Sequence, residues 1–209
     1  MRALVFLCAL MFATASAAAD LSVEVRTGAG RPVPDAVVTL YPASGTPPVG
    51  QGRFDWPMRM VQQHLQFSPF VLIAPVGATV AFPNLDQVRH HVYSFSPAHP
   101  FELKLYGRDE TRTVRFDRPG AIALGCNIHD QMIAFIKVVD TPYAAKTDAN
   151  GVAVLHDAQP GGAVMHVWHP FMKSPGNEIV QTVVLPRTGG VNQAVRVDLR
   201  SPPDRGGGY

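Results

Sequence analysis

The stretch AIALGCNIHDQMIAFIKVV, residues 121–139, indicates what kind of fold this chain adopts. It places two apolar, strand-forming segments, Ala121 to Leu124 and Ile133 to Val139, on either side of a short polar loop. Short runs of β-branched and other apolar residues bounded by turn residues are typical of β-strands. The loop between them holds a cysteine, a histidine and a methionine. The sequence therefore predicts two neighbouring strands joined by a loop whose cysteine, histidine and methionine are candidate functional residues.

The same pattern of short strands and turns continues on both sides of this stretch. The 209 residues include 18 Gly and 19 Pro, a content that suits many strands joined by turns, and no segment has the periodicity of a long helix. We therefore predict an all-β protein built as a β-sandwich or Greek-key barrel. Further strands are expected at residues 21–26, 36–41, 70–82 with a break at 75–77, 90–95 and 111–116.

Composition excludes several classes of protein. The formal net charge is only +2, from 18 Lys and Arg against 16 Asp and Glu, and the basic residues are scattered. Nucleic-acid binding by counterion release needs a basic cluster, which this sequence lacks. Hydrophobic residues make up 46% of the chain, which is too many for intrinsic disorder.

The N-terminus is typical of an export signal. Arg2 precedes an uncharged, largely apolar run that ends with Ala17 and Ala19 in an A-x-A arrangement. We interpret residues 1–19 as a signal peptide that is removed, which predicts a periplasmic protein with no membrane anchor after cleavage. At the other end, the Pro- and Gly-rich residues 201–209 are expected to form a disordered tail.

Cleavage would leave one cysteine, because Cys8 belongs to the signal and Cys126 to the central loop. A disulfide framework in an oxidising compartment needs an even number of cysteines. A lone thiol there is protected by burial, by pairing with another chain or by a metal. Cys126 is thus either a small buried apolar residue or a metal ligand.

The neighbours of Cys126 favour the metal. Cys126, His129 and Met132 have the spacing Cys-x₂-His-x₂-Met, and an upstream strand contains His90 and His91. Two imidazoles and a thiolate in a plane, with a distant thioether, form the ligand set of a blue-copper site. Soft sulfur ligands combined with imidazole select copper over hard cations.

These residues also resemble those of a known family. The segments Phe82-Pro83-Asn84-Leu85-Asp86, His90-His91-Val92-Tyr93-Ser94 and Leu124-Gly125-Cys126-Asn127-Ile128-His129 are similar to those of cupredoxins, in particular amicyanin and the plastocyanin-like proteins often labelled methylamine utilisation proteins. The resemblance covers roughly residues 65–140. It implies a Greek-key cupredoxin sandwich with one type 1 copper bound by His90, Cys126, His129 and Met132, and electron transfer in the periplasm.

The choice between the two adjacent histidines follows from the resemblance and from strand geometry. The spacing from Asn84 places His90 at the family's ligand position, and only one of two successive strand residues can face the metal. His91 stands where relatives usually carry Asn. We expect its side chain to donate a hydrogen bond to the Cys126 loop.

The flanking regions do not fit a minimal cupredoxin. Residues 20–64 contain N-terminal strands and a linker, and residues 141–200 form a further β-sandwich-like region. Both contain turn-and-strand patterns that resemble transthyretin-like or carboxypeptidase-regulatory-like sandwiches, so a second small sandwich is expected, which the N-terminal strands could join. His166 and His169 would lie on opposite faces of one strand, which argues against a second metal site.

The function predicted from the sequence is electron transfer by a protein that is not an enzyme. Its redox partner would be a c-type cytochrome, a dehydrogenase or an oxidase, and the sequence does not distinguish among them. A periplasmic copper carrier with the same ligands is the main alternative. A cysteine hydrolase is a weaker one, because it would need an open cleft and a base beside Cys126.

Overall fold

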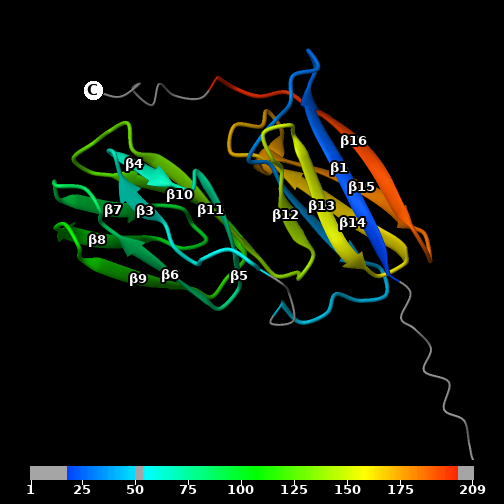
Figure 1. Cartoon of the computed structure of the whole chain (residues 1–209), viewed down its shortest axis with the longest axis horizontal. Helices are drawn as coiled ribbons and strands as arrows, with labels where there is room; N and C mark the ends of the chain where they lie inside the picture. The colour runs from blue at the N-terminus through cyan, green and yellow to red at the C-terminus, as the bar shows by residue number, and fades with distance from the viewer. Residues whose placement is uncertain (1–17, 50–53, 202–209) are drawn as a thin grey trace, which may run out of the picture.

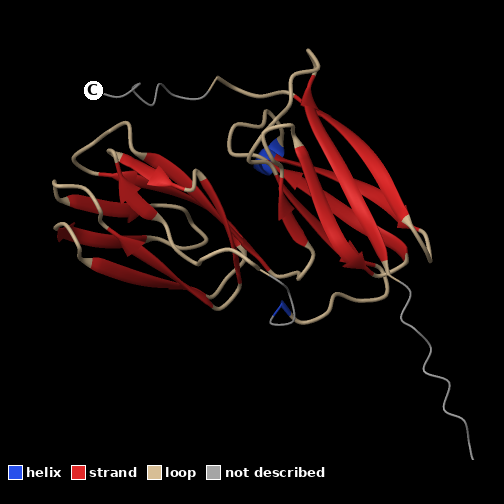
Figure 2. Ribbon diagram, in the orientation of Figure 1, coloured by secondary structure: helices blue, strands red, loops and turns tan. Residues whose placement is uncertain are grey.

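The computed structural model describes residues 18–49 and 54–201. Its ribbon forms two β-sandwiches side by side, one green and cyan, the other blue, yellow and orange (Figure 1). Strands dominate both, and the described residues contain no α-helix (Figure 2). The expected signal peptide and tail lie outside the described residues except for residues 18, 19 and 201.

The strands follow in chain order. They are β1 Ala19–Thr27, β2 Val37–Pro42, β3 Val61–Gln63, β4 Gln66–Ser68, β5 Val71–Pro75, β6 Ala78–Pro83, β7 His90–Ser94, β8 Phe101–Tyr106, β9 Thr111–Phe116, β10 Gly120–Cys126, β11 Ile133–Val139, β12 Ala144–Lys146, β13 Val152–Ala158, β14 Gly161–Trp168, β15 Glu178–Leu185 and β16 Gly190–Val197. A 3₁₀ turn, η2 Pro175–Asn177, precedes β15.

The first sandwich, which we call the site sandwich, contains β3 to β11. A five-stranded sheet in the order β5-β11-β10-β7-β8 is accompanied by the pairs β6-β9 and β3-β4. β10 pairs with β11 and with β7, so the strand of His90 lies beside the strand that ends at Cys126. The apolar side chains between the sheets form one core. Its largest buried members include Met60, Phe82, Tyr106, Phe116, Ile122, Met132 and Ile136.

The second sandwich joins the two ends of the described chain. A three-stranded sheet, β13-β1-β16, faces a four-stranded sheet, β12-β2-β14-β15, around a separate apolar core. β1 pairs in parallel with β16, with Asp20 opposite Gly190 and Thr27 opposite Val197. The N-terminal strands thus complete the C-terminal sandwich. The likeness of this sandwich to transthyretin-like domains stays a prediction.

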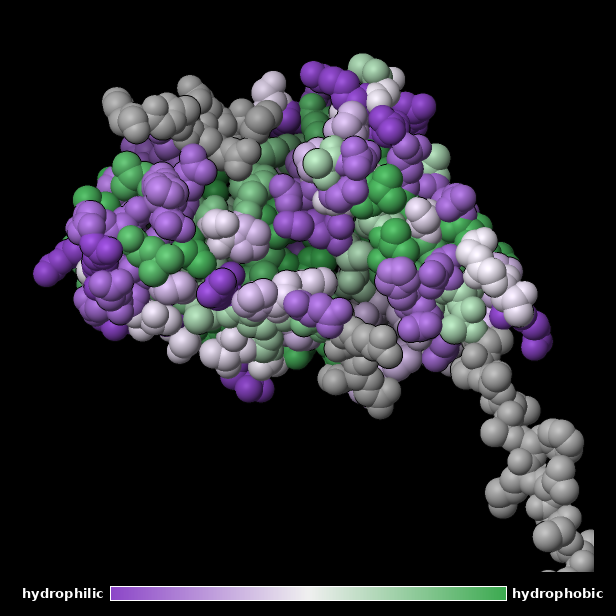
Figure 3. All heavy atoms as spheres, in the orientation of Figure 1, coloured by the Kyte–Doolittle hydropathy of each residue, from purple (hydrophilic) through white to green (hydrophobic). Residues whose placement is uncertain are grey.

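The two sandwiches share a third apolar cluster. Trp168 at the end of β14 packs edge-on against Phe135 of β11, with ring centroids 6.2 Å apart, and both residues belong to this cluster. Lys137 lies 5.3 Å from the Trp168 ring centroid and pairs with Glu178 at 3.1 Å. Apolar side chains also gather between the two sandwiches on the face in Figure 3. The sandwiches are therefore joined by a packed interface as well as by the chain.

His169 follows Trp168 and is held in its neutral form. The residue is 6% exposed, and its Nδ1 accepts a hydrogen bond from the amide of Phe171 at 3.2 Å. Burial disfavours the imidazolium, which lowers the pKa of His169 from an ordinary 6.5 to about 4, against a small opposing effect of Asp35.

This histidine makes stability depend on pH. Between pH 6.5 and 4 the unfolded chain binds a proton at His169 and the folded chain does not, so acidification favours unfolding. The contribution is complete above pH 6.5, and a shift of this size corresponds to about 3 kcal/mol lost by pH 4. Denaturant unfolding of the metal-free chain across this range measures it. We expect His169→Asn, which keeps an acceptor for Phe171, to flatten the pH dependence; an unchanged slope would assign it to other groups.

In the part of the chain that the structure describes, no helix has the length and apolar character needed to cross a membrane.

Candidate metal centre

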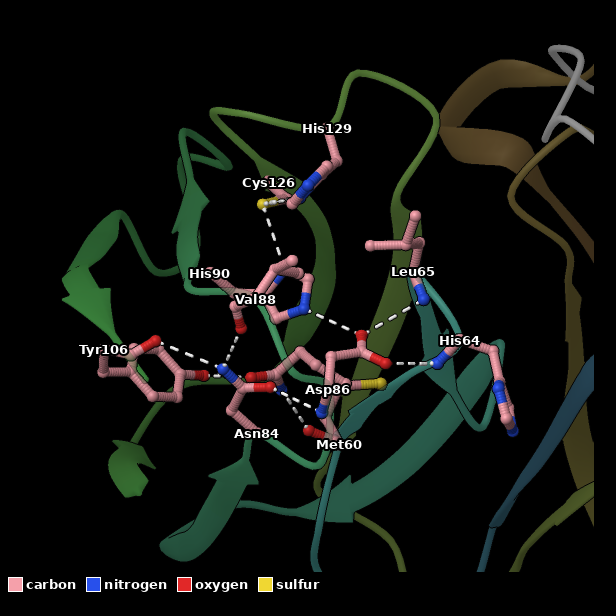
Figure 4. Close-up of polar contacts among 11 residues, drawn as sticks. Met60, His64, Leu65, Asn84, Asp86, Val88, His90, Tyr106, Cys126 and His129 are labelled. Atoms are coloured by element: carbon pink, nitrogen blue, oxygen red, sulfur yellow. Dashed lines mark hydrogen bonds and ion pairs between the residues drawn. The ribbon is translucent and has the colours of Figure 1, made fainter. Parts of the chain in front are cut away.

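Three potential ligands meet at one end of the site sandwich. His90 begins β7, Cys126 ends β10, and His129 lies in the loop that follows. The Cys126 Sγ atom is 3.6 Å from Nδ1 of His90 and 3.5 Å from Nδ1 of His129. The two imidazole rings lie 5.0 Å apart and are inclined by 58°. Figure 4 shows His90 below the sulfur atom and His129 beside it.

The loop after Cys126 is shaped by backbone hydrogen bonds. The Asn127 amide donates to the carbonyl of His91 at 3.0 Å, which extends the β7–β10 pairing past the strand end. The Met132 amide donates to the carbonyl of His129 at 2.9 Å and closes the turn. These bonds direct His129 back toward the sulfur atom.

A glycine permits the close strand packing beside the cluster. A Cβ atom at Gly125 would lie 2.7 Å from the Tyr93 ring, nearer than carbon atoms approach without displacement. The residue before Cys126 therefore has to be small for Tyr93 to pack across the pair β7–β10.

The environment of Cys126 favours the thiolate. Burial alone raises the pKa of this thiol, but hydrogen bonds from His90, from the backbone of His91 and Ile128, and from His129 outweigh it. The pKa falls from 9.0 to about 6. The thiolate is the form of cysteine that binds metals, so the free-energy cost of deprotonation at neutral pH is small.

His90 is completely buried and is held from its far side. Its Nε2 atom lies 2.8 Å from a carboxylate oxygen of Asp86. Desolvation lowers the pKa of His90, but its contacts with Cys126 and Asp86 outweigh this and raise the pKa overall. A carboxylate only accepts hydrogen bonds, so Nε2 carries a proton toward Asp86, and the second proton of the imidazolium, on Nδ1, is shared with the Cys126 thiolate. A metal ion bound to Nδ1 would displace that second proton.

Asn84 organises the segment that leads to His90. Its side chain, fully buried, donates to the carbonyls of Val88 at 2.8 Å and Tyr106 at 3.2 Å and accepts from the Asp86 amide at 2.9 Å. One side chain thereby fixes both ends of the short loop between β6 and β7. The Tyr106 hydroxyl in turn donates a hydrogen bond to the buried Gln62 side chain.

The structure separates the two adjacent histidines. His90 points into the cluster, whereas Nε2 of His91 lies 2.8 Å from a carboxylate oxygen of Glu102, and the His91 carbonyl accepts a hydrogen bond from the amide of Asn127. The expectation that the His91 side chain bonds to the Cys126 loop is therefore wrong. Strand alternation explains the outcome, since successive side chains point to opposite faces.

Met132 lies in the core of the site sandwich. It is 1% exposed and belongs to the same apolar cluster as Cys126. This burial in the same core as Cys126 is compatible with a thioether ligand, and the role of Met132 as a ligand stays a prediction.

The donor set fits a first-row metal ion. Ligand atoms of His90, Cys126 and His129 all lie within 4.8 Å of one another. A sulfur ligand at about 2.3 Å and a nitrogen ligand at about 2.0–2.1 Å from an ion in a trigonal plane would lie roughly 3.7–3.8 Å apart. The two Sγ–Nδ1 distances, 3.6 and 3.5 Å, are within about 0.3 Å of this spacing. One ion could therefore bind with little movement of the side chains.

Three of the other histidines belong to the second sandwich. His166 pairs with Glu178 at 2.9 Å, His156 with Asp20 at 3.2 Å, and His169 is the buried residue described above. Within residues 18–49 and 54–201, the trio of His90, Cys126 and His129 is the one cluster of His, Cys, Asp or Glu with metal-binding geometry.

Sequence reasoning missed the part played by Asp86. The only signal was its position four residues before His90, in a segment quoted solely for its resemblance. It also missed β8, which supplies Tyr106, and the hairpin β3–β4 beside the cluster.

Comparison with known proteins finds likeness in structure alone. No family model and no curated protein matches the chain. A copper-containing nitrite reductase from Thermus scotoductus SA-01 is 28% identical over 46% of this chain, with a TM-score of 0.38, and the match spans 25% of the reductase. Two reduced amicyanin mutants are each 18% identical over 49% of this chain and 98% of their own, with a TM-score of 0.37.

The expected fold class is confirmed. The chain is all-β, and in the site sandwich one histidine lies on a strand while a cysteine and a second histidine lie at the end of the neighbouring strand.

Proposed function

We propose that this protein is a blue-copper electron carrier that binds one copper ion through His90, Cys126, His129 and Met132. The observation that carries the proposal is the spacing of two Nδ1 atoms about one buried thiol whose pKa is lowered to about 6. Thiolate and imidazole together favour copper among the divalent metals. When bound, copper would supply a one-electron couple.

The hydrogen bonds around the ligands suit electron transfer. His90 is clamped between Asp86 and Cys126, and the loop of His129 is closed by backbone bonds. A site that barely moves between two oxidation states exchanges electrons with little reorganisation. This favours a carrier of electrons over a carrier of copper, because a carrier of copper has to release its ion readily.

We also propose that the protein is not an enzyme. Cys126 is 3% exposed in an apolar cluster, which leaves a nucleophilic thiol without access to a substrate. Met132, as the fourth ligand, would fill the position that catalytic metal sites keep open.

A redox partner would dock beside His129, the most exposed of the three clustered residues. Its neighbour Ile128 is 48% exposed, and Leu65, Leu85 and Val88 are each more than 40% exposed next to residues that contact the site. Weak redox encounters use small interfaces of this kind. A c-type cytochrome, a dehydrogenase or an oxidase in the periplasm would suit such a face, and export would follow from the N-terminal signal.

The visible absorption spectrum tests the proposal. Adding Cu²⁺ to the purified chain should produce an intense blue band, ascorbate should bleach it, and reoxidation should restore it. Copper bound only as Cu⁺ without colour would favour the copper carrier. No copper binding would make Cys126 a buried thiol and the proposal wrong.

Met132→Leu separates the thioether from the other ligands. We expect the variant to stay blue, since His90, Cys126 and His129 remain, and to have a higher reduction potential because an axial donor to Cu²⁺ is lost. The exchange of Met for Leu nearly conserves volume, so it should cost less than about 1.5 kcal/mol of stability. Voltammetry of both proteins measures the potential; an unchanged value would exclude Met132 as a ligand.

A further inference from the structure

Asp86 connects the candidate metal centre to a neighbouring hairpin. Its Oδ2 atom lies 2.8 Å from Nε2 of His90 and accepts from the amide of Leu65 at 3.1 Å, while Oδ1 accepts from the amide of His64 at 2.6 Å. The side chain is 12% exposed. Three donors thus converge on one carboxylate, as the dashed lines in Figure 4 show.

The two amides come from an unusual turn. His64 and Leu65 link β3 to β4 with φ of 57° and 54°, the conformation of a two-residue type I′ turn. Such turns prefer Asn and Gly, because side chains with a Cβ are strained at positive φ. The carboxylate offsets this strain by accepting both amides of the turn. The hairpin therefore holds the carboxylate in place against His90.

We propose that Asp86 is a positioning residue for copper, which orients His90 and lowers the reduction potential of the site. The proposal rests on the blue-copper function above. A carboxylate bonded to Nε2–H fixes the tautomer and the ring orientation and makes Nδ1 a stronger donor. A stronger donor stabilises Cu²⁺ more than Cu⁺, because the higher charge gains more from donated electron density.

A purely structural role predicts something different. If Asp86 only held the turn of His64 and Leu65, its loss would weaken the fold and leave the relative affinity for the two copper oxidation states unchanged. The reduction potential therefore distinguishes the two roles, and the unfolding midpoint of the metal-free chain measures the structural part separately.

Asp86→Asn is the decisive variant. It keeps the shape of the side chain and one acceptor oxygen, which can serve His90 or the His64 amide but not both. Outer partners of metal ligands typically change metal affinity by about 10–100-fold. We expect at least a tenfold loss of Cu²⁺ affinity relative to Cu⁺, which for one electron equals a potential about 59 mV higher. Asp130→Asn is the matched control, because this exposed carboxylate lies beside His129 without a side-chain hydrogen bond in the described structure.

The outcomes separate the two proposals. A higher potential in Asp86→Asn but not in Asp130→Asn supports the inference, whereas equal shifts in both variants, or a lower unfolding midpoint with an unchanged potential, overturn it. A wild-type chain that binds no copper refutes the proposed function instead. If Asp86→Asn does not fold, proton NMR of the unsubstituted Cu⁺ form decides. A His90 Nε2 proton in slow exchange with water is expected, and a rapidly exchanging one overturns the inference.

Discussion

Cys126→Ser is expected to abolish the intense visible band of the copper-loaded chain and to lower its copper affinity by more than about 100-fold. The loss should exceed the roughly 10–100-fold typical of an outer partner, because a ligand itself is removed. The Cys126 sulfur lies 3.5–3.6 Å from Nδ1 of both imidazoles, and a serine hydroxyl in its place stays protonated near neutral pH. Its loss removes both the charge and the soft ligand that select copper.

Titration with Cu²⁺, followed by absorption and by competition with a chelator, measures both effects. The metal-free variant should keep the unfolding cooperativity of the wild type, since serine has the shape of cysteine and is slightly smaller, so it fits a site that is 3% exposed. Met132→Leu is the matched comparison, because it alters a buried neighbour and keeps the thiolate. A blue Cys126→Ser protein would place the sulfur ligand elsewhere and contradict the assignment of the centre.

The candidate metal centre could be predicted from the sequence where its residues lie close together or follow strand alternation. Cys126 and His129 are three residues apart in one loop, so any tight turn brings them together. His90 rather than His91 faces the sulfur because side chains alternate along β7. Local geometry was sufficient for Cys126 and His129, whereas the choice of His90 over His91 also needed the spacing from Asn84 given by the family resemblance.

Hydrogen bonds between segments that lie far apart in the sequence were not predicted. Asp86 reaches His90 because Asn84 fixes the loop between them, and the turn at His64 and Leu65 forms because Asp86 accepts its amides. Neither His64 nor Leu65 favours positive φ, so local propensity argues against the hairpin that forms. Tertiary hydrogen bonds decided these positions.

The pairing of β1 with β16 is a second case of this kind. Both segments alternate apolar and polar residues, and each could pair with many others. The parallel register from Asp20–Gly190 to Thr27–Val197 depends on burying one face of both strands against the same core. A sequence pattern predicts each strand but not its partner.

Trp168→Ala is expected to lower the free energy of unfolding by about 3–5 kcal/mol, the usual cost of truncating a buried aromatic side chain. Trp168 is 2% exposed and lies in the cluster shared by the two sandwiches, where it contacts Phe135 and Lys137. Its removal leaves a void between the sandwiches that their separate cores do not fill. We therefore expect the second sandwich to unfold at a lower denaturant concentration than the site sandwich.

Two signals followed in one denaturant titration measure this uncoupling. Circular dichroism reports on the strands of both sandwiches, and the blue band reports on the proposed ligands in the site sandwich, of which Cys126 and Met132 belong to a different apolar cluster from Trp168. In the wild type the two curves should coincide, whereas in Trp168→Ala circular dichroism should change first while the colour persists. Trp168→Phe is the matched control, because it keeps an aromatic face for Lys137 and leaves a smaller void than alanine. The part of the indole that it removes includes the ring nitrogen, which is buried without a hydrogen-bond partner in the described structure. Coincident curves in Trp168→Ala with a loss below about 1 kcal/mol would mean that the linker and polar contacts, rather than this cluster, hold the two sandwiches together.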